Sequence, residues 1–110
     1  MAMIRTGLIQ QSNTGNTRDN MDRLEKNIRS LAKKEAQLIV MQELHNSLYF
    51  CQTEDPDQFN LAESIPGPST QRFGELAREL GVVIVTSLFE KRAPGLYHNT
   101  AVVLDQDGSM

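Results

Sequence analysis

Apolar residues recur at steps of three and four in two segments of the chain, which is the spacing of an amphipathic helix. In the first segment they are Met21, Leu24, Ile28 and Leu31. In the second, which begins at Ser69, they are Phe73, Leu76, Ala77 and Leu80. Asn16 can cap the start of the first helix, and Gly81 is placed for a left-handed cap after the second. The pattern therefore predicts two helices.

Four other segments have apolar residues without the helical period and have the length of strands. They cover residues 3–10, 38–41, 82–89 and 96–104. The second and third, "LIVM" and "VVIVTSLF", are continuous apolar runs rather than alternating ones. Such runs are typical of strands that are covered on both faces, so we expect both faces of these strands to be buried.

Along the chain these elements follow the order strand, helix, strand, helix, strand, strand. The alternation predicts an α/β fold with a parallel core, and the turn material "EKRAPG" before the last strand predicts a hairpin. Residues 45–68 contain three prolines and form a longer connection than most. Loops of this length either contribute to a functional site or lack a fixed structure.

The final residues carry a turn signal. The stretch "DQDG", residues 105–108, follows the last strand directly and promises a return strand that does not follow within the 110 residues. We therefore expect residues 1–110 to be the amino-terminal portion of a single, longer domain.

Composition and charge narrow the possible functions. The chain has 39% hydrophobic and 23% charged residues, as in ordinary globular proteins, and a net charge of -3. This charge provides neither a basic patch for nucleic acid nor a polybasic surface for membranes. No apolar run has the length of a membrane span, and the first residues lack the features of a secretion signal. We expect a small molecule or another protein chain as the partner.

Cys51 is the single cysteine, so the chain cannot form an internal disulfide, and no Cys or His spacing suggests a zinc site. A lone cysteine suits the reducing cytosol, where we expect the protein to be. His45 and His98 make a Cys/His nucleophile pair conceivable. No turn-helix context presents the thiol, however, and a partly buried loop thiol is the alternative interpretation.

One acidic residue stands where ligands usually bind. Glu43 directly follows the stretch "LIVMQ", and ligands of open α/β sheets bind outside the carboxyl ends of the strands. The long loop that follows would partly desolvate this carboxylate, which suits a general base. Many acidic residues at strand ends are only solvated, and position alone leaves this alternative open.

Three ordered stretches cover nearly the whole chain. They are "LIVMQELHNSLYFCQ", "PGPSTQRFGELARELGVVIVTSLFE" and "GLYHNTAVVLDQDG". These stretches resemble successive signature segments of the nitrilase superfamily of carbon-nitrogen hydrolases, and "QELHNSLYFCQ" is the most specific of them. Within the superfamily the chain most resembles the N-carbamoylputrescine amidohydrolases.

The resemblance implies the amino-terminal part of a four-layer α-β-β-α sandwich that works without a metal or an organic cofactor. It also implies a Glu, Lys and Cys triad. Glu43 matches the general base of this triad, whereas the lysine and the cysteine would lie beyond Met110. Tyr49 and Phe50 match the loop that shapes the substrate pocket. Asn99 interrupts an apolar strand and either contacts the substrate or satisfies main-chain groups near the site.

The activity that the resemblance implies is hydrolysis of a non-peptide carbon-nitrogen bond, converting N-carbamoylputrescine to putrescine, carbon dioxide and ammonia. Ureidopropionate and simple aliphatic amides are alternative substrates within the family. The parent would be a homo-oligomer, because the family's sandwiches stack face to face, and the 110 residues alone should be inactive. A function of another class is also open: a complete, non-catalytic α/β module that binds a small ligand or a protein.

Overall fold

The computed structural model describes residues 2–49 and 56–110. Its elements, in chain order, are β1 (Thr6–Ile9), α1 (Thr17–Lys33), β2 (Leu38–Met41), the 3-10 helix η1 (Pro56–Leu61), α2 (Pro68–Leu80), β3 (Val83–Ala93) and β4 (Leu96–Leu104). The predicted order of strands and α-helices is confirmed. The 3-10 helix lies in the long loop, for which no regular structure was predicted.

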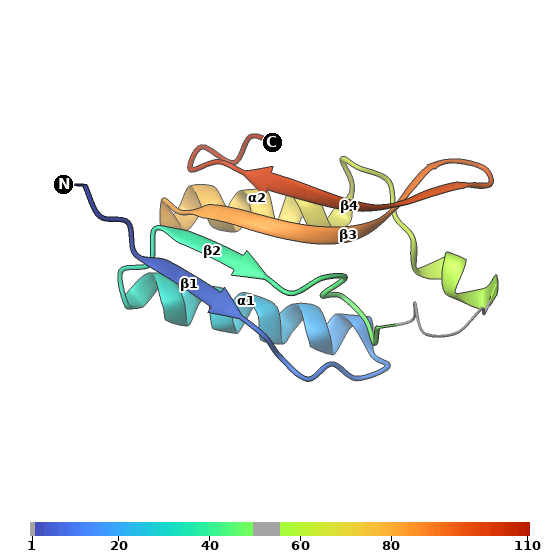
Figure 1. Ribbon diagram of the computed structural model, residues 1–110, viewed down its shortest axis with the longest axis horizontal. Coiled ribbons are helices and arrows are strands. Elements are labelled where there is room, and N and C mark those ends of the chain that lie inside the picture. Colours follow the sequence, from blue (N-terminus) through green and yellow to red (C-terminus); the bar gives the residue numbers. More distant parts are fainter. Residues whose placement is uncertain (1, 50–55) are drawn as a thin grey trace.

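The strands of the described residues form a sheet in the order β1-β2-β3-β4. β1, β2 and β3 are parallel, and β4 runs antiparallel to β3. Both helical connections step in the same direction along the sheet, so α1 and α2 lie on one of its faces (Figure 1). We call this face the helix-covered face.

Local signals fix the ends of both helices. The Asn16 side chain accepts a hydrogen bond from the Asp19 amide at 3.1 Å and caps α1. Gly81 adopts a φ of 67° after α2, a left-handed conformation that is easy for glycine. α2 begins at Pro68 rather than at the expected Ser69, because proline at the first helical position gives up only an amide hydrogen that the helix does not use.

The main difference in the strands is at the hairpin. β4 has the predicted bounds, but β3 continues past Phe89 to Ala93. Pairing with β4 satisfies the main chain of these added residues up to the turn at Pro94 and Gly95, where Gly95 has a φ of 77°. The apolar pattern could not predict this extension, because three of the four added residues are charged and the extension depends on pairing with β4.

The hydrophobic core lies between the sheet and the two helices. Ile39, Ile84 and Phe73 have no exposed surface, and Leu24 and Ile28 of α1 are equally buried against them. Burying a side chain of this size contributes about 1.5–3 kcal/mol to stability. The helix-covered face therefore supplies most of the energy that holds the fold together.

The opposite face of the sheet is also apolar, but it is open. Leu8, Val40, Val85 and Val103 lie in one row across the sheet, because they are register partners on adjacent strands. Leu8 is 75% exposed and Val103 is 53% exposed. The prediction that residues 38–41 and 82–89 are buried on both faces is met on the helix-covered face, whereas Val40 and Val85 on this face are half-buried in the described part of the chain, because α1 and α2 both lie on the other side. We call the face with this row the open face.

The predicted turn after β4 is present and folds back onto α2. The Gly108 amide donates to Asp105 O at 2.9 Å, and Gly108 has a φ of 87°. A Cβ atom at Gly74 of α2 would lie only 2.9 Å from the Gly108 carbonyl oxygen. The close approach of these two backbones therefore requires glycine at both positions.

Candidate active site

Glu43 lies two residues beyond β2, at the edge of the sheet where the carboxyl ends of the parallel strands meet. Before it, the Gln42 side chain pairs with the main chain of Gln11. The Gln11 amide donates to Gln42 Oε1 at 2.5 Å, and Gln42 Nε2 donates to Gln11 O at 3.0 Å. A side-chain amide thus continues the hydrogen bonding between β1 and β2 beyond the strands and holds the chain in place just before Glu43.

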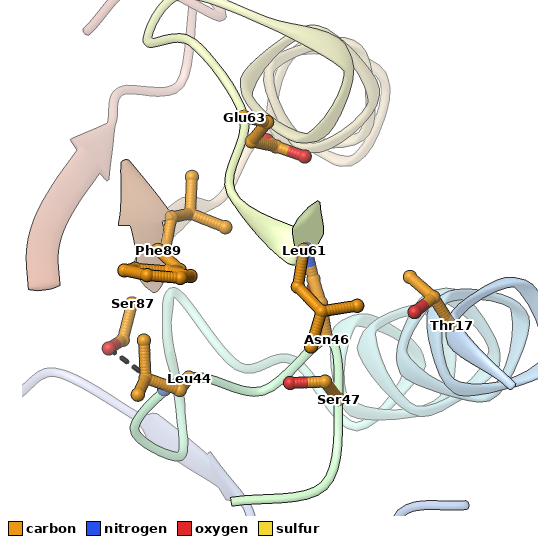
Figure 2. A pocket seen from close by; sticks show the side chains of 9 residues that line it. Thr17, Leu44, Asn46, Ser47, Leu61, Glu63, Ser87 and Phe89 are labelled. Carbon is orange, nitrogen blue, oxygen red and sulfur yellow. Dashed lines mark hydrogen bonds between the residues drawn. The ribbon is translucent and has the colours of Figure 1, made fainter. Parts of the chain in front are cut away.

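The turn that begins at Glu43 contains a residue with unusual backbone geometry. Leu44 has a φ of 49°, which is uncommon for residues other than glycine. Its side chain is only 4% exposed, so burial offsets the cost of this conformation. The Leu44 amide donates to Ser87 Oγ of β3 at 2.9 Å (Figure 2). The turn is therefore tied to the neighbouring strand.

A ring of hydrogen bonds joins Glu43 to β3 and β4. Ser87 Oγ donates to Asn99 Oδ1 at 3.3 Å, and Asn99 Nδ2 donates to Glu43 Oε1 at 2.5 Å. With the bond from the Leu44 amide to Ser87 Oγ, these contacts close a ring back to the peptide between Glu43 and Leu44. Ser87 and Asn99 alternate in step with the apolar row of the open face. The carboxylate therefore lies over the open face.

Glu43 is exposed to solvent, so the expectation that the long loop desolvates it is not met by the described residues. The later part of the loop pairs sideways with β3 instead of covering the carboxylate. The Glu63 amide donates to Phe89 O at 3.0 Å, and the Lys91 amide donates to Glu63 O at 2.8 Å. The reason is that β3 extends beyond β2, and its unpaired edge offers hydrogen-bonding groups to the loop.

Of the other predicted site residues, the structure places Asn99 at the Glu43 carboxylate and Tyr49 at an exposed position, and it does not describe Phe50. The structure brings Asn99 to the Glu43 carboxylate, so its amide binds a side chain rather than main-chain groups. Tyr49 is 50% exposed. Phe50 and Cys51, the other loop residues discussed above, lie outside the described residues.

Ser87 was not identified from the sequence, although its hydroxyl links the turn to Asn99. The signal available was a small polar residue at the same alternation as Val83 and Val85 in an otherwise apolar strand. This signal marks a polar position on the strand. It does not reveal the partner of Ser87, because the partner depends on the register between β3 and β4.

His45, in the same turn, is completely buried. Its ring meets the Phe73 ring edge-on at a centroid distance of 5.3 Å, and neither ring nitrogen has a hydrogen-bond partner within the described part of the chain. Burial lowers the pKa of His45 to about 4. The imidazole is therefore neutral at pH 7 and serves packing rather than proton transfer.

Two amide side chains, one half-buried and one buried, hold the turn against the loop between β1 and α1. Asn13 Nδ2 donates to His45 O at 2.7 Å and to Ser47 O at 2.8 Å. Asn20, which has no exposed surface, donates to Asn46 O at 3.1 Å. Satisfied buried networks of this kind rigidify their surroundings. The turn that carries Glu43 is therefore fixed from both sides.

A small cavity lies beside this turn (Figure 2). It is lined by Leu44, Asn46, Glu63, Ser87 and Phe89, among others. Its volume of about 40 Å³ has room for a water molecule but not for an organic ligand. The Glu63 carboxylate is already engaged, since it accepts bonds from the Ser69 amide at 3.1 Å and the Ser69 hydroxyl at 3.0 Å. A ligand of Glu43 would therefore lie on the open face.

Within residues 2–49 and 56–110, no cluster of three or more His, Cys, Asp or Glu side chains could hold a metal ion. No helix of this part of the chain is long and apolar enough to cross a membrane. The chemistry that the described site offers is that of a carboxylate that can accept a proton.

Comparison with known proteins identifies the family. Residues 5–110 match the family model described as carbon-nitrogen hydrolase. Over 108 residues the chain is 34% identical to an N-carbamoylputrescine amidase of Solanum lycopersicum. The matched region covers 97% of this chain and 36% of that protein. It is 33% identical to a citrullinase of Francisella tularensis, over 100% of this chain and 38% of that protein.

A solved structure has the same fold. The crystal structure of a carbon-nitrogen hydrolase from Helicobacter pylori G27 is 40% identical, with a TM-score of 0.89 over 96% of this chain and 37% of that chain. The chain thus spans little more than a third of the length of these relatives. Its fold is that of the amino-terminal part of the nitrilase fold, as predicted. The chain belongs to the carbon-nitrogen hydrolase family of the nitrilase superfamily.

Proposed function

We propose that the protein containing this chain hydrolyses the carbon-nitrogen bond of a carbamoyl or linear amide group, with Glu43 as its general base. The observation that carries the proposal is the position of this carboxylate. It stands at the carboxyl edge of the parallel strands, where ligands of α/β proteins bind. Asn99 Nδ2 donates a hydrogen bond to its Oε1 atom at 2.5 Å. Membership of a carbon-nitrogen hydrolase family supports the reaction type.

The proposed reaction needs two further groups. The family resemblance supplies a cysteine and a lysine, which we place in parts of the protein outside these 110 residues. Glu43 would take the thiol proton, the thiolate would attack the carbonyl carbon, and Glu43 would return the proton to the leaving nitrogen, which departs as ammonia. Glu43 would then activate the water that releases the acyl group, while the lysine stabilises the oxyanion. The 110-residue chain alone should therefore release no ammonia.

The proposed substrate is N-carbamoylputrescine, which one water molecule converts to putrescine, carbon dioxide and ammonia. Support comes from two relatives, one named for this compound and one for citrulline. Both compounds carry a terminal ureido group, so the bond that these names share is the ureido carbon-nitrogen bond. A simple aliphatic amide is the alternative within the family.

An aromatic cluster supports a substrate with an amine at its far end. Phe89 is the register partner of Asn99, and its ring lies 5.7 Å from that of Tyr97 and 6.0 Å from that of Phe59. The rings of Phe59 and Tyr97 are 4.5 Å apart. Aromatic faces attract alkylammonium groups. A substrate whose carbonyl lies at Glu43 could therefore extend its ammonium group along β3 and β4 toward this cluster.

The test is ammonia release by the full-length protein from N-carbamoylputrescine, citrulline and n-butylurea. The last compound has the same ureido group and carbon chain as N-carbamoylputrescine but no amine. We expect kcat/KM for N-carbamoylputrescine to exceed that for n-butylurea by about tenfold. Replacing the base in Glu43→Gln should lower kcat by about 10²- to 10⁴-fold.

Glu75→Gln is the matched control, because Glu75 is an exposed carboxylate on α2, away from the open face. It should have the wild-type rate. Wild-type activity in Glu43→Gln would exclude Glu43 as the base. If the full-length protein binds these compounds without releasing ammonia from any of them, the non-catalytic binding module is favoured instead.

We further propose that the full-length protein is a homo-oligomer in the cytosol. The family resemblance supports the assembly, and the lone cysteine of these 110 residues supports the compartment. Light scattering on the eluting full-length protein should give a multiple of the subunit mass, and a monomer would contradict the proposal.

A further inference from the structure

We infer that Ser87 and Asn99 form a positioning relay that holds the Glu43 carboxylate by one oxygen and leaves the other as its proton acceptor. The inference rests on the proposed function in one respect, that Glu43 acts as a base. Its structural content is the ring of hydrogen bonds through Leu44, Ser87 and Asn99.

The direction of each hydrogen bond in the ring is fixed by its two ends, the Leu44 amide and the Glu43 carboxylate. The Leu44 amide can only donate, so Ser87 Oγ must accept there, at 2.9 Å. The single hydroxyl hydrogen of Ser87 is then free for Asn99 Oδ1 at 3.3 Å. The Glu43 carboxylate can only accept, so the Asn99 amide presents its NH₂ group to Glu43 and its oxygen to Ser87. Glu43 and Ser87 together therefore determine the orientation of the Asn99 amide.

This orientation leaves the two carboxylate oxygens of Glu43 in different environments. Oε1 accepts from Asn99 Nδ2 at 2.5 Å, whereas no described residue donates a hydrogen bond to Oε2. A reversed Asn99 amide would place its oxygen against the carboxylate, which is repulsive. We therefore assign Oε2 as the oxygen that takes the proton, and Oε1 as the anchor.

The geometry of the strands explains why these two residues can act together. Ser87 faces Ala101 in the register of β3 and β4, so Asn99 is its diagonal neighbour on the open face, within reach of a side-chain amide. The small side chain of Ala101 leaves the relay unobstructed. All members of the ring except Leu44 are accessible to solvent. Exposed hydrogen bonds compete with water and add little stability, so the effect of the relay is on orientation.

The test compares variants of the full-length protein by ammonia release. Asn99→Ala removes the donor to Oε1 and should lower kcat about 10²-fold, because misplaced catalytic groups lose about this much. Ser87→Ala should lower kcat about five- to tenfold, since water can partly replace its hydroxyl. Both variants should leave KM within about twofold of the wild type, because neither residue is placed on the substrate.

Thr100→Val is the matched control. Thr100 follows Asn99 on β4 and also donates to a carboxylate, Glu90 Oε1, at 2.8 Å. This bond has no link to Glu43, so the variant should keep the wild-type kcat. Ser87→Thr, which retains the hydroxyl, should restore most of the rate lost in Ser87→Ala. The double variant Ser87→Ala, Asn99→Ala should be no slower than Asn99→Ala alone, because both residues act through the same oxygen.

Two kinetic results would overturn the inference and leave the proposed function intact. One is wild-type kcat in both Ser87→Ala and Asn99→Ala, and the other is fully additive losses in the double variant. A crystal structure of the Ser87→Ala protein gives an answer that does not depend on activity. We expect the distance between Asn99 Nδ2 and Glu43 Oε1 to lengthen, and an unchanged contact would overturn the relay even if no amide proved to be a substrate.

Discussion

The two faces of the sheet differ in what covers them and in what they carry. On the helix-covered face, Ile39 and Ile84 have no exposed surface and pack under α1 and α2. On the open face, the ring of hydrogen bonds around Glu43 lies beside an apolar row in which Val103 is 53% exposed. The comparison indicates that the core and the proposed general base lie on opposite faces of the same strands.

The difference comes from the connections between strands rather than from the strands themselves. Val102 and Val103 are adjacent and identical in type, yet they are 7% and 53% exposed. Both helical connections lie on the same side of the sheet, so alternate residues of a single apolar run have opposite environments. Substitutions on the helix-covered face should therefore change mainly the free energy of unfolding, and substitutions on the open face should change mainly the proposed activity.

The largest expected effect is a difference in stability between a substitution on the helix-covered side and one on the open face. Phe73→Ala removes a completely buried ring from the helix-covered side and should lower the free energy of unfolding by about 3–5 kcal/mol. Glu43→Gln, on the open face, keeps an acceptor for Asn99. It should change the free energy of unfolding by less than about 0.5 kcal/mol. Urea denaturation of both variants measures the difference, and comparable losses would contradict a division of labour between the faces.

The next effect is a pH dependence that arises on the helix-covered side. His45 has a pKa of about 4 in the fold against 6.5 when free, so between these values the unfolded chain binds a proton that the folded chain does not. The free energy of unfolding should therefore decrease as pH falls from about 6.5 to 4, by about 3 kcal/mol in total.

The free energy of unfolding is measured at pH 7 and pH 4 for the wild type and for His45→Leu. The difference between the two proteins separates the contribution of His45 to the acid sensitivity from that of the carboxylates. The variant should lose less stability on acidification. His98→Leu, at an exposed position of β4, serves as the control and should follow the wild type. Equal acid sensitivity of His45→Leu and the wild type would show that the imidazole is not buried as described.

A smaller effect should separate adjacent residues of β4. In the 110-residue chain, Val102→Thr places a hydroxyl in the core and should cost about 1–3 kcal/mol, whereas Val103→Thr, on the open face, should change stability by less than about 0.5 kcal/mol. The two substitutions are chemically identical, so thermal or urea unfolding compares the faces directly. A larger loss for Val103→Thr would mean that the open face is covered in solution.

The smallest expected effect is on the outer surface of the helices. Arg72 pairs with Asp22 at 2.8 Å and with Glu25 at 3.1 Å. These groups are partly exposed, so Asp22→Asn should lower the free energy of unfolding by less than about 1 kcal/mol. The difference from the wild type should shrink further at high salt, which screens exposed charges. A loss that is insensitive to salt would point to packing rather than charge.

The sequence predicted the features that depend on neighbouring residues. The cap at Asn16, the left-handed Gly81 and the bounds of β4 all follow from local patterns. The position of Glu43 at the strand edge also follows from the order of elements. The relay through Ser87 could not be predicted, because it depends on the register of two strands. The burial of His45 likewise depends on packing against α2, which no local pattern encodes.

The turn that follows β2 decides on which side of the sheet the acidic side chain of Glu43 emerges. Ile39 and Met41 of β2 point toward the helices, and strict alternation would send residue 43 the same way. In a chain that stayed extended, the ionised Glu43 carboxylate would be buried in the hydrophobic core and the Leu44 side chain would be exposed to water. The turn of residues 43–46, in which Leu44 has a φ of 49°, instead exposes the carboxylate and buries the leucine. Because β2 ends in a turn here, Glu43 and Leu44 have the opposite of the environments that alternation would give them.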